Sequence, residues 1–244
     1  MLIHPSLDRL SALRLVGMRQ AFEEQLQLPE IHSLSFEERL GLLIDREWTV
    51  RENRRLTSRL KKATLRHRAA ALEDVDYRHP RGLDKSVLTR LATSQWVRDH
   101  HNVLITGPTG IGKSWLACAL VQKACRDGLT ARYLHLTKLL RELSLGQGDG
   151  RYPKLMKELA HTDLIALDDF GLEPLHDEHQ RILLELMEDR YELRSTLITS
   201  QYPTEHWHER IGNPTLADAI LDRLVHNAYK LNLQGESLRK KTHP

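Results

Sequence analysis

The feature that most constrains the fold of this chain is a glycine-rich segment, Gly107-Pro-Thr-Gly-Ile-Gly-Lys-Ser114, which follows the short apolar run 102–106. It matches the pattern G-x-x-x-x-G-K-[ST] between an expected strand and an expected helix, the context that this pattern requires. The glycines let consecutive backbone N–H groups turn inward around phosphate oxygens, and the helix N-terminus adds partial positive charge. The segment therefore predicts a P-loop that binds ATP.

The roles of the P-loop residues follow from this arrangement. Lys113 is expected to reach the β- and γ-phosphates of ATP, and the Ser114 hydroxyl is expected to bind Mg²⁺. Trp115 is better suited to packing the helix than to stacking on adenine. The residues expected around the nucleotide are Gly107, Pro108, Thr109, Gly110, Ile111, Gly112, Lys113, Ser114 and Trp115.

A second motif supplies a pair of acids, because Leu164-Ile-Ala-Leu is followed directly by Asp168 and Asp169. A buried parallel strand is apolar on both faces, so acids at its C-terminal end project into the crevice where ligands bind. We expect Asp168 on the Mg²⁺ side, through a water molecule, and Asp169 to orient or activate the attacking water. Taken alone, Leu-Asp-Asp could also be a helix-capping turn.

The alternation of strands and helices predicts an α/β fold, a three-layer αβα P-loop architecture with a parallel sheet. An extra strand between the P-loop and the acid-bearing strand favours an additional-strand ATPase over a small-molecule kinase or a GTPase. Residues 146–150 are interpreted as a glycine-rich break. The expected strands are 102–106, 130–136, 163–168 and 195–200, and the expected helices are 114–126, 137–145, 152–159, 178–194 and 218–224.

The N-terminal part of the chain is interpreted as helical. Ser35-Phe-Glu-Glu resembles a capping sequence that opens a helix continuing to Arg68. We expect a helical domain at 1–76, a linker with a short helix at 77–98 and the ATPase domain at 99–244. No apolar run approaches the roughly 20 residues that span a bilayer, and no signal peptide is evident, so we expect a cytoplasmic protein without membrane contact.

Residues 51–68 carry eight positive charges and one negative charge, although the net charge of the chain is only +3. Such density matches a phosphate-binding footprint on nucleic acid, while a solvated helix face or an acidic protein partner is the alternative. Backbone contacts would give weak sequence preference. The candidate DNA contacts are Arg51, Arg54, Arg55, Arg59, Lys61, Lys62, Arg66 and Arg68, with a second group at Lys138, Arg141, Arg151 and Lys154.

Further polar residues lie beyond the two nucleotide motifs. Thr199, Ser200 and Gln201 end the fourth expected strand, and one of them could sense the γ-phosphate, although each could equally be a polar strand terminus. Arg223 and Arg239 are downstream arginines that pattern alone does not separate from solvated surface residues.

Segments outside the nucleotide site resemble the IstB family of insertion-sequence ATP-binding proteins, AAA+ ATPases related to the helicase loader DnaC and the initiator DnaA. The similar segments are Ser35–Trp48, Arg51-Glu-Asn-Arg-Arg-Leu, Leu221-Asp-Arg-Leu-Val-His and Gly235-Glu-Ser-Leu-Arg. The resemblance implies a bacterial, DNA-associated protein that forms ATP-dependent homo-oligomers on double-stranded DNA and assists a cognate transposase.

The resemblance also implies roles for single residues. Arg223 would be an arginine finger acting on a neighbouring subunit's ATP, Arg239 a sensor-II arginine, and the turn at 199–201 sensor I. Gln201 stands where the family often has asparagine. Asp169 stands where most AAA+ enzymes have glutamate, and its shorter arm implies weak hydrolysis. The competing hypotheses are a helicase loader acting on single-stranded DNA and a monomeric P-loop kinase indifferent to DNA.

Overall fold

The structure is a computed structural model that describes residues 5–238. The chain divides into two compact units, the N-terminal unit Met1–Ser58 and the C-terminal unit Arg59–Pro244. The division comes earlier than the boundary expected at residue 76, because the segment after Ser58 bonds to the C-terminal unit. Arg59 Nε donates to the carbonyl oxygen of Cys125 at 2.9 Å, and Thr64 Oγ1 donates to that of Tyr133 at 2.9 Å.

The N-terminal unit consists of helices. They are α1 (Pro5–Ala12), α2 (Val16–Gln27), the 3-10 helix η1 (Pro29–Ser33) and the first part of α3 (Phe36–Ala63). Ser35 and Glu38 form the expected capping box at the start of α3: Glu38 Oε2 accepts from the Ser35 amide at 2.7 Å, and Ser35 Oγ accepts from the Glu38 amide at 3.2 Å. These reciprocal bonds satisfy backbone donors that the helix itself leaves unpaired.

Helices α2 and α3 are joined by a glycine and a buried carboxylate. A Cβ atom on Gly17 would lie 2.6 Å from Glu47 Cα, so the backbones approach more closely there than any other residue would allow. Glu47 Oε2 accepts from the amides of Gly17 at 2.7 Å and Met18 at 3.1 Å, and Oε1 accepts from Arg51 Nε at 2.6 Å. Glu47 therefore caps the N-terminus of α2 from the neighbouring helix.

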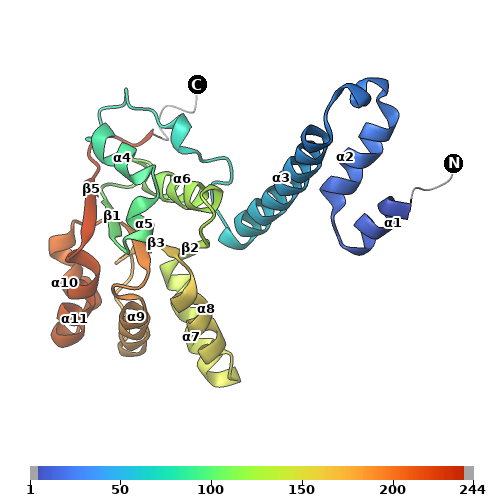
Figure 1. The fold of residues 1–244 in the computed structure, drawn as a ribbon. Helices are drawn as coiled ribbons and strands as arrows, with labels where there is room; N and C mark the ends of the chain where they lie inside the picture. Colours follow the sequence, from blue (N-terminus) through green and yellow to red (C-terminus); the bar gives the residue numbers. More distant parts are fainter. Residues whose placement is uncertain (1–4, 239–244) are drawn as a thin grey trace. The chain divides into compact units, whose positions relative to one another are not determined.

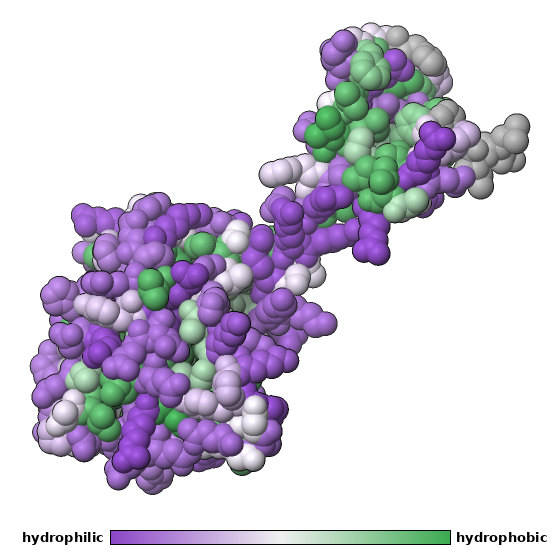
Figure 2. All heavy atoms as spheres, turned by 60° about the horizontal axis from the view of Figure 1, so that its bottom comes forward, coloured by the Kyte–Doolittle hydropathy of each residue, from purple (hydrophilic) through white to green (hydrophobic). Residues whose placement is uncertain are grey.

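Large apolar side chains remain exposed on this unit, and Figure 2 shows hydrophobic residues at its surface. Phe36, Leu40, Ile44 and Trp48 recur every fourth residue along α3, and each of them is exposed. Residues at this spacing share one side of a helix. An exposed apolar stripe of this kind marks a surface for protein contacts.

The C-terminal unit is built on a five-stranded sheet with the order β2-β3-β4-β1-β5, in which every pairing is parallel. Four of the strands were expected, and β4 pairs with the acid-bearing strand β3. The fifth strand was not predicted. The strands are β1 (Asn102–Thr106), β2 (Ala131–His135), β3 (Leu164–Phe170), β4 (Ser195–Ser200) and β5 (Ala228–Asn232).

Helices cover both faces of this sheet (Figure 1). Helix α6 (Lys113–Arg126) packs against β1, β2, β3 and β4. A contiguous apolar core joins the sheet residues Leu104, Ile165 and Ile198 to the helices that cover the other face. Those helices are α7 (Leu136–Asp149), α8 (Tyr152–His161), α9 (Asp177–Arg190), α10 (Trp207–Ile211) and α11 (Pro214–Val225). The predicted three-layer αβα architecture is therefore confirmed.

The remaining short elements lie before β1 and after β4. They are η2 (Leu72–Asp74), α4 (Lys85–Leu91), α5 (Gln95–Arg98) and η3 (Thr204–His206). Cys118 and Cys125 on α6 are both free and buried. Within residues 5–238, no helix has the length and apolar character needed to cross a membrane.

Two predicted helix boundaries are wrong. Helix α3 ends at Ala63 and not at Arg68, because Thr64 adopts a left-handed backbone with φ of 52°. The predicted break at 146–150 is also wrong, since α7 continues to Asp149 and turns only at Gly150. Gly146 is buried inside this helix, where a Cβ atom would lie 3.2 Å from the Tyr152 amide nitrogen, so its role is close packing against α8.

Candidate nucleotide site

The P-loop connects the end of β1 at Thr106 to the start of α6 at Lys113. Gly107 and Gly110 have φ of 140° and 85°, in the left-handed half of backbone space that favours glycine. A Cβ atom at Gly107 would lie 2.2 Å from the Leu233 carbonyl oxygen, and one at Gly110 would lie 2.1 Å from Ser237 Oγ. The loop therefore requires glycine at both positions.

The two polar residues that open α6 face the loop and the acid-bearing strand. Lys113 is buried, and its Nζ donates to the carbonyl oxygens of Gly107 at 2.7 Å and Pro108 at 2.9 Å. Ser114 Oγ donates to Asp168 Oδ1 at 2.9 Å. Ser114 therefore contacts the end of β3, whereas the Lys113 ammonium group bonds to the P-loop backbone.

Asp168 is fully buried, and several donors satisfy its carboxylate. Oδ1 accepts from Thr199 Oγ1 as well as from Ser114, and Oδ2 accepts from the Tyr133 hydroxyl. Arg66 Nη1 lies 3.8 Å from Oδ2. A buried charge is retained only when it is paired and hydrogen-bonded in this way. The carboxylate oxygens of Asp168 and the hydroxyl oxygen of Ser114 are ligands of the type that Mg²⁺ prefers.

Asp169 follows in an unusual backbone conformation. Its φ of 63° is rare for a non-glycine residue, and the register of β3 against β4 shifts between Leu167 and Phe170. Such irregularities re-aim side chains near functional sites. Its amide donates to Thr199 Oγ1 at 3.1 Å, and its Oδ2 lies 3.4 Å from His135 Nε2.

The electrostatics of Asp169 follow from this position. Burial, reinforced by the neighbouring Asp168 charge, raises the pKa of the Asp169 carboxyl above its usual value. The positive charges of His135, Arg66 and Lys113 oppose this rise. A carboxylate with a raised pKa is a stronger base than an exposed aspartate, which suits a group that handles protons.

A cavity of about 560 Å³ lies over these residues, within the size range of small-molecule sites. It brings together most of the P-loop, Asp169, Gln201 and Trp115. The lining residues are Arg66, His67, Asp74, Asp76, Arg81, Thr109, Gly110, Gly112, Lys113, Ser114, Trp115, Asp169, Gln201 and Leu238.

Several lining residues were not predicted, since they come from the segment before α4, far from the P-loop in sequence. Arg81 is buried, and its guanidinium donates to the carbonyl oxygens of Ile111 at 3.1 Å and Asp76 at 3.2 Å. It therefore ties the P-loop to the preceding segment. From the sequence, Arg81 was assigned only to the expected linker at 77–98.

The other predicted site residues have different positions. Ser200 Oγ donates to the carbonyl oxygen of Phe170 at 2.8 Å, whereas Thr199 joins both acids. Arg223 does not line the nucleotide cavity, because its guanidinium donates to the carbonyl oxygen of Ala219 at 2.7 Å and to Glu188 Oε1 at 3.0 Å. Arg239 lies outside the described residues.

The basic residues predicted to bind DNA are divided between the two units. In the N-terminal unit, Arg51 pairs with Glu47 and Arg55 with Glu52. In the C-terminal unit, Arg66 lines the nucleotide cavity. All members except the half-buried Arg59 are exposed, and Arg54, Lys61, Lys62 and Arg68 are those outside the ion pairs and the cavity named above.

The second basic group occupies the hairpin of α7 and α8, which lie side by side in Figure 1. All four of its members, Lys138, Arg141, Arg151 and Lys154, are exposed. Arg151 pairs with Asp149 at 2.8 Å, and Arg141 lies 3.9 Å from Glu173.

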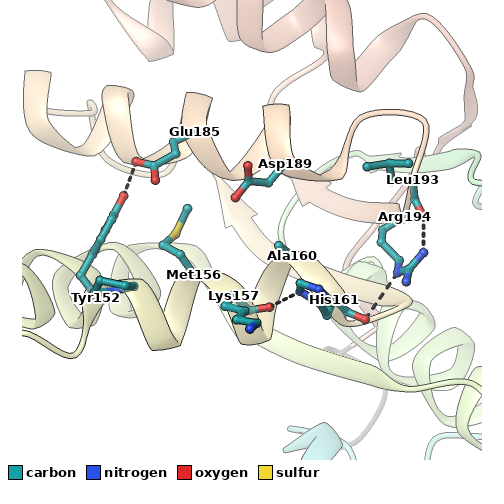
Figure 3. Close-up of a pocket in the computed structure, with 10 residues that line it drawn as sticks. Tyr152, Met156, Lys157, Ala160, His161, Glu185, Asp189, Leu193 and Arg194 are labelled. Carbon is teal, nitrogen blue, oxygen red and sulfur yellow. Dashed lines mark hydrogen bonds between the residues drawn. The ribbon is translucent and has the colours of Figure 1, made fainter.

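A second cleft, of about 690 Å³, lies between α8 and α9 (Figure 3). Its lining residues include Met156, Ala160, Leu193 and Asp189, and Tyr152 donates to Glu185 across one end at 2.6 Å. It shares no lining residue with the nucleotide cavity and has no glycine loop for phosphate. The smaller cavity is therefore the candidate nucleotide site.

The fold and the site define the class of this protein. A parallel sheet in which β4 lies between the P-loop strand β1 and the acid-bearing strand β3, with Ser114 of the P-loop bonded to Asp168, is that of an additional-strand P-loop ATPase.

Comparison with known proteins identifies the family. A family model described as IstB-like ATP binding protein matches residues 8–244, and the chain belongs to this family. The insertion sequence ATP-binding protein y4pL of Sinorhizobium fredii is 53% identical over 240 residues, which cover 98% of each chain. The insertion sequence IS21 ATP-binding protein of Pseudomonas aeruginosa is 33% identical over 232 residues, covering 95% of this chain and 87% of that protein.

Solved structures agree on the fold. The DnaC helicase loader has a TM-score of 0.56 at 21% identity, covering 67% of this chain and 96% of that chain. DnaI has a TM-score of 0.58 at 20% identity, covering 68% and 91%. At these identities the similarity establishes the AAA+ fold alone. The resemblance inferred from sequence motifs is confirmed, and the protein is an ATPase of the IstB-like family.

Proposed function

We propose that this protein is an ATP-dependent, DNA-binding AAA+ ATPase that oligomerises on double-stranded DNA and assists a transposase in selecting target DNA. The observation that carries the proposal is the bond between Ser114 of the P-loop and Asp168, beside a cavity that the P-loop and Asp169 line, in a chain whose relatives belong to insertion sequences. Because those relatives are bacterial, we place the protein in the bacterial cytoplasm, associated with DNA.

The residues of the cavity have complementary roles in this proposal. Ser114 and Asp168 would hold Mg²⁺, which would neutralise charge on the phosphate oxygens, and Lys113 would contact the β- and γ-phosphates. Asp169 holds the attacking water, and Thr199, which bonds to both acids, is the strongest candidate for sensor I. Gln201 lines the cavity and is the second candidate.

Two exposed basic surfaces are proposed to contact DNA. One is the basic segment of α3 and the residues that follow it, apart from Arg66. The other is the α7–α8 hairpin with Lys138, Arg141, Arg151 and Lys154. Contacts from these side chains to phosphate would give affinity with little sequence preference. The exposed apolar stripe on α3 is assigned to protein contacts.

ATP is proposed to act as an assembly switch. Arg223 lies outside the nucleotide cavity of its own chain, which is the arrangement expected for an arginine finger that completes a neighbouring subunit's site. Arg239 remains the proposed sensor-II residue. Hydrolysis would then release the subunits from DNA or from each other.

The alternative is a helicase loader acting on single-stranded DNA, which the similarity of the fold to DnaC and DnaI favours. Fluorescence anisotropy on labelled duplex and single-stranded DNA, with ATP, a slowly hydrolysed analogue or ADP, separates the two functions. We expect ATP-dependent, sequence-tolerant duplex binding. A preference for single strands would favour the loader, and an absence of DNA binding would exclude both.

Variants localise the DNA surface and the ATP roles. Lys61→Ala with Lys62→Ala should weaken duplex binding and reduce the salt dependence by about one unit of slope per lost phosphate contact. Arg78→Ala with Arg90→Ala removes the same charge from exposed positions outside the proposed surfaces and serves as the control. Arg223→Ala should retain ATP binding but lose turnover in DNA-bound assemblies, and normal turnover would refute the finger.

A further inference from the structure

Arg66 differs from the other basic residues of its segment in its location. It lines the nucleotide cavity together with Lys113, Ser114 and Asp169. Its Nη1 lies 3.8 Å from Asp168 Oδ2, while about half of its side chain, 51%, remains exposed. Arg66 therefore extends into a cavity that holds the phosphate-binding loop, although charge density alone grouped it with DNA contacts.

The backbone fixes the position of Arg66 at the edge of this cavity. The left-handed conformation of Thr64 ends α3, and Thr64 Oγ1 donates to the carbonyl oxygen of Tyr133 in β2 at 2.9 Å. Ala63 and Leu65, on either side of Thr64, are buried. The backbone that carries Arg66 is thus already ordered, so less conformational entropy is lost when its guanidinium binds a ligand.

The guanidinium also belongs to a hydrogen-bonded chain that reaches the acid pair. A hydrogen bond with the Tyr133 hydroxyl raises the pKa of Arg66, although partial burial opposes the rise. The same hydroxyl donates to Asp168 Oδ2. A guanidinium carries more N–H donors than these contacts employ, and its fork geometry matches phosphate oxygens.

The contacts of Asp168 place Arg66 at the phosphate end of the cavity. Arg66 Nη1 lies 3.8 Å from one carboxylate oxygen of Asp168, and the other oxygen accepts from Ser114 of the P-loop. Arg66 also lines the same cavity as Lys113, the residue that meets the β- and γ-phosphates in this fold. A second cation in this cavity, beside the acid that Ser114 contacts, is therefore close to the expected position of the terminal phosphate.

We propose that Arg66 binds the terminal phosphate of ATP held in its own chain, so that the cavity favours the triphosphate over the diphosphate. The proposal rests on the nucleotide site proposed above. With ADP bound, Arg66 would keep its contacts with Tyr133 and Asp168. With ATP bound, it would add a charge-assisted bond that the diphosphate cannot form. This cis arginine would act beside any arginine that a neighbouring subunit contributes.

The test is the affinity of the full-length protein for two nucleotides, measured by isothermal titration calorimetry with Mg²⁺. A slowly hydrolysed ATP analogue and ADP are titrated into the wild type, Arg66→Ala, Arg66→Lys and the control Arg90→Ala, an exposed arginine of the same unit that does not line the cavity. We expect Arg66→Ala to bind the analogue roughly tenfold to a hundredfold more weakly, and ADP within about threefold of the wild type. Arg66→Lys, which keeps the charge without the fork, should lose less affinity for the analogue.

The outcomes separate the proposal from its alternatives. Equal weakening for both nucleotides would show that Arg66 only maintains the site, and unchanged affinities would show that it does not contact the nucleotide; either result overturns the proposal. If Arg66→Ala fails to fold, Arg66→Lys decides, since it must weaken the analogue more than ADP. If the wild type bound neither nucleotide, the nucleotide site itself would be refuted.

Discussion

Arg190 is an almost fully buried arginine at the end of α9, with an exposed fraction of 1%. Its Nε donates to Thr196 Oγ1 at 3.2 Å, and Nη1 donates to the carbonyl oxygens of Leu159 and Thr162, the latter at 2.8 Å. Nη2 donates to the carbonyl oxygen of Ser195. One side chain therefore ties together the end of α8, the end of α9 and the start of β4, the strand that carries Thr199.

The loss of unfolding free energy on replacing Arg190 with methionine can be estimated from these bonds. Arg190→Met keeps an unbranched apolar stem but removes the arginine donor from three buried groups, the carbonyls of Thr162 and Ser195 and the Thr196 hydroxyl. The Leu159 carbonyl still accepts from the Thr162 amide at 3.3 Å. Each unsatisfied group costs about 1–3 kcal/mol. Removing a buried charge recovers part of the desolvation cost, so we take the low end, a loss of about 3 kcal/mol. For a unit of this size, that loss lowers the melting temperature by roughly 6–12 °C.

The assay follows the C-terminal unit alone. The chain has four tryptophans, of which only Trp48 belongs to the N-terminal unit, so a Trp48→Phe background leaves three reporters in the C-terminal unit. Urea unfolding is then followed by tryptophan fluorescence, with Arg194→Met as the control. Arg194 is a third exposed. It bonds to the adjacent Leu193 carbonyl at 2.7 Å, but its contacts with His161 and Asp163 are 3.4 and 3.6 Å long, so its loss should cost under about 1 kcal/mol. If the two variants lost similar stability, the reasoning from buried hydrogen bonds would be refuted.

Three further predictions concern the joint between α2 and α3 and the acid pair. Burial by itself raises the pKa of Glu47, but hydrogen bonds from Arg51, Met18 and Gly17 outweigh it and lower the pKa. The stabilisation that the Glu47 carboxylate contributes is therefore present at a pH above its unfolded-state pKa of 4.5, and it is lost as the pH falls through the folded-state pKa. Glu47→Gln should remove this pH dependence of stability, measured by urea unfolding between about pH 3 and pH 7. Gly17→Ala should cost about 1–3 kcal/mol and speed amide hydrogen exchange in α2, and unchanged exchange would contradict the close contact. Asp169→Asn should slow phosphate release about a hundredfold or more while nucleotide affinity, measured by calorimetry, stays near that of the wild type; normal turnover would exclude Asp169 as the base.

The central strands that were predicted correctly have a run of apolar residues in the local sequence, and the strand that was missed has none. Strands β1, β3 and β4 are central, and runs such as 164–167 are apolar throughout because both faces are covered. Strand β5 is an edge strand that reads Ala228-Tyr-Lys-Leu-Asn, and Leu231 alone within it is buried. Its pairing with β1 is made by the backbone, which leaves no hydrophobic pattern in the sequence.

The site, like the sheet, was predictable only where a local sequence pattern marks its residues. Lys113, Ser114 and the acid pair follow from motifs because both motifs lie at the carboxyl ends of strands of one parallel sheet. The contribution of Arg66 and Arg81 depends on how a segment far from the P-loop packs against it, which no local pattern encodes. Gly146 illustrates the same limit, since a glycine that permits close helix packing looks like a helix breaker when only sequence is available.

The position of Arg223 bears on how a site shared between subunits could be regulated. Its guanidinium pairs with Glu188, whose side chain is about half exposed, and accessible pairs of this kind contribute only about 0–1 kcal/mol. Releasing Arg223 toward a neighbouring nucleotide therefore costs little, and a charge-assisted bond to phosphate would more than offset it. Glu188→Gln should accordingly leave turnover in DNA-bound assemblies unchanged or raise it. If this substitution instead abolished turnover as Arg223→Ala is expected to do, the pair itself would be required for activity, and Arg223 would not be a finger that leaves it.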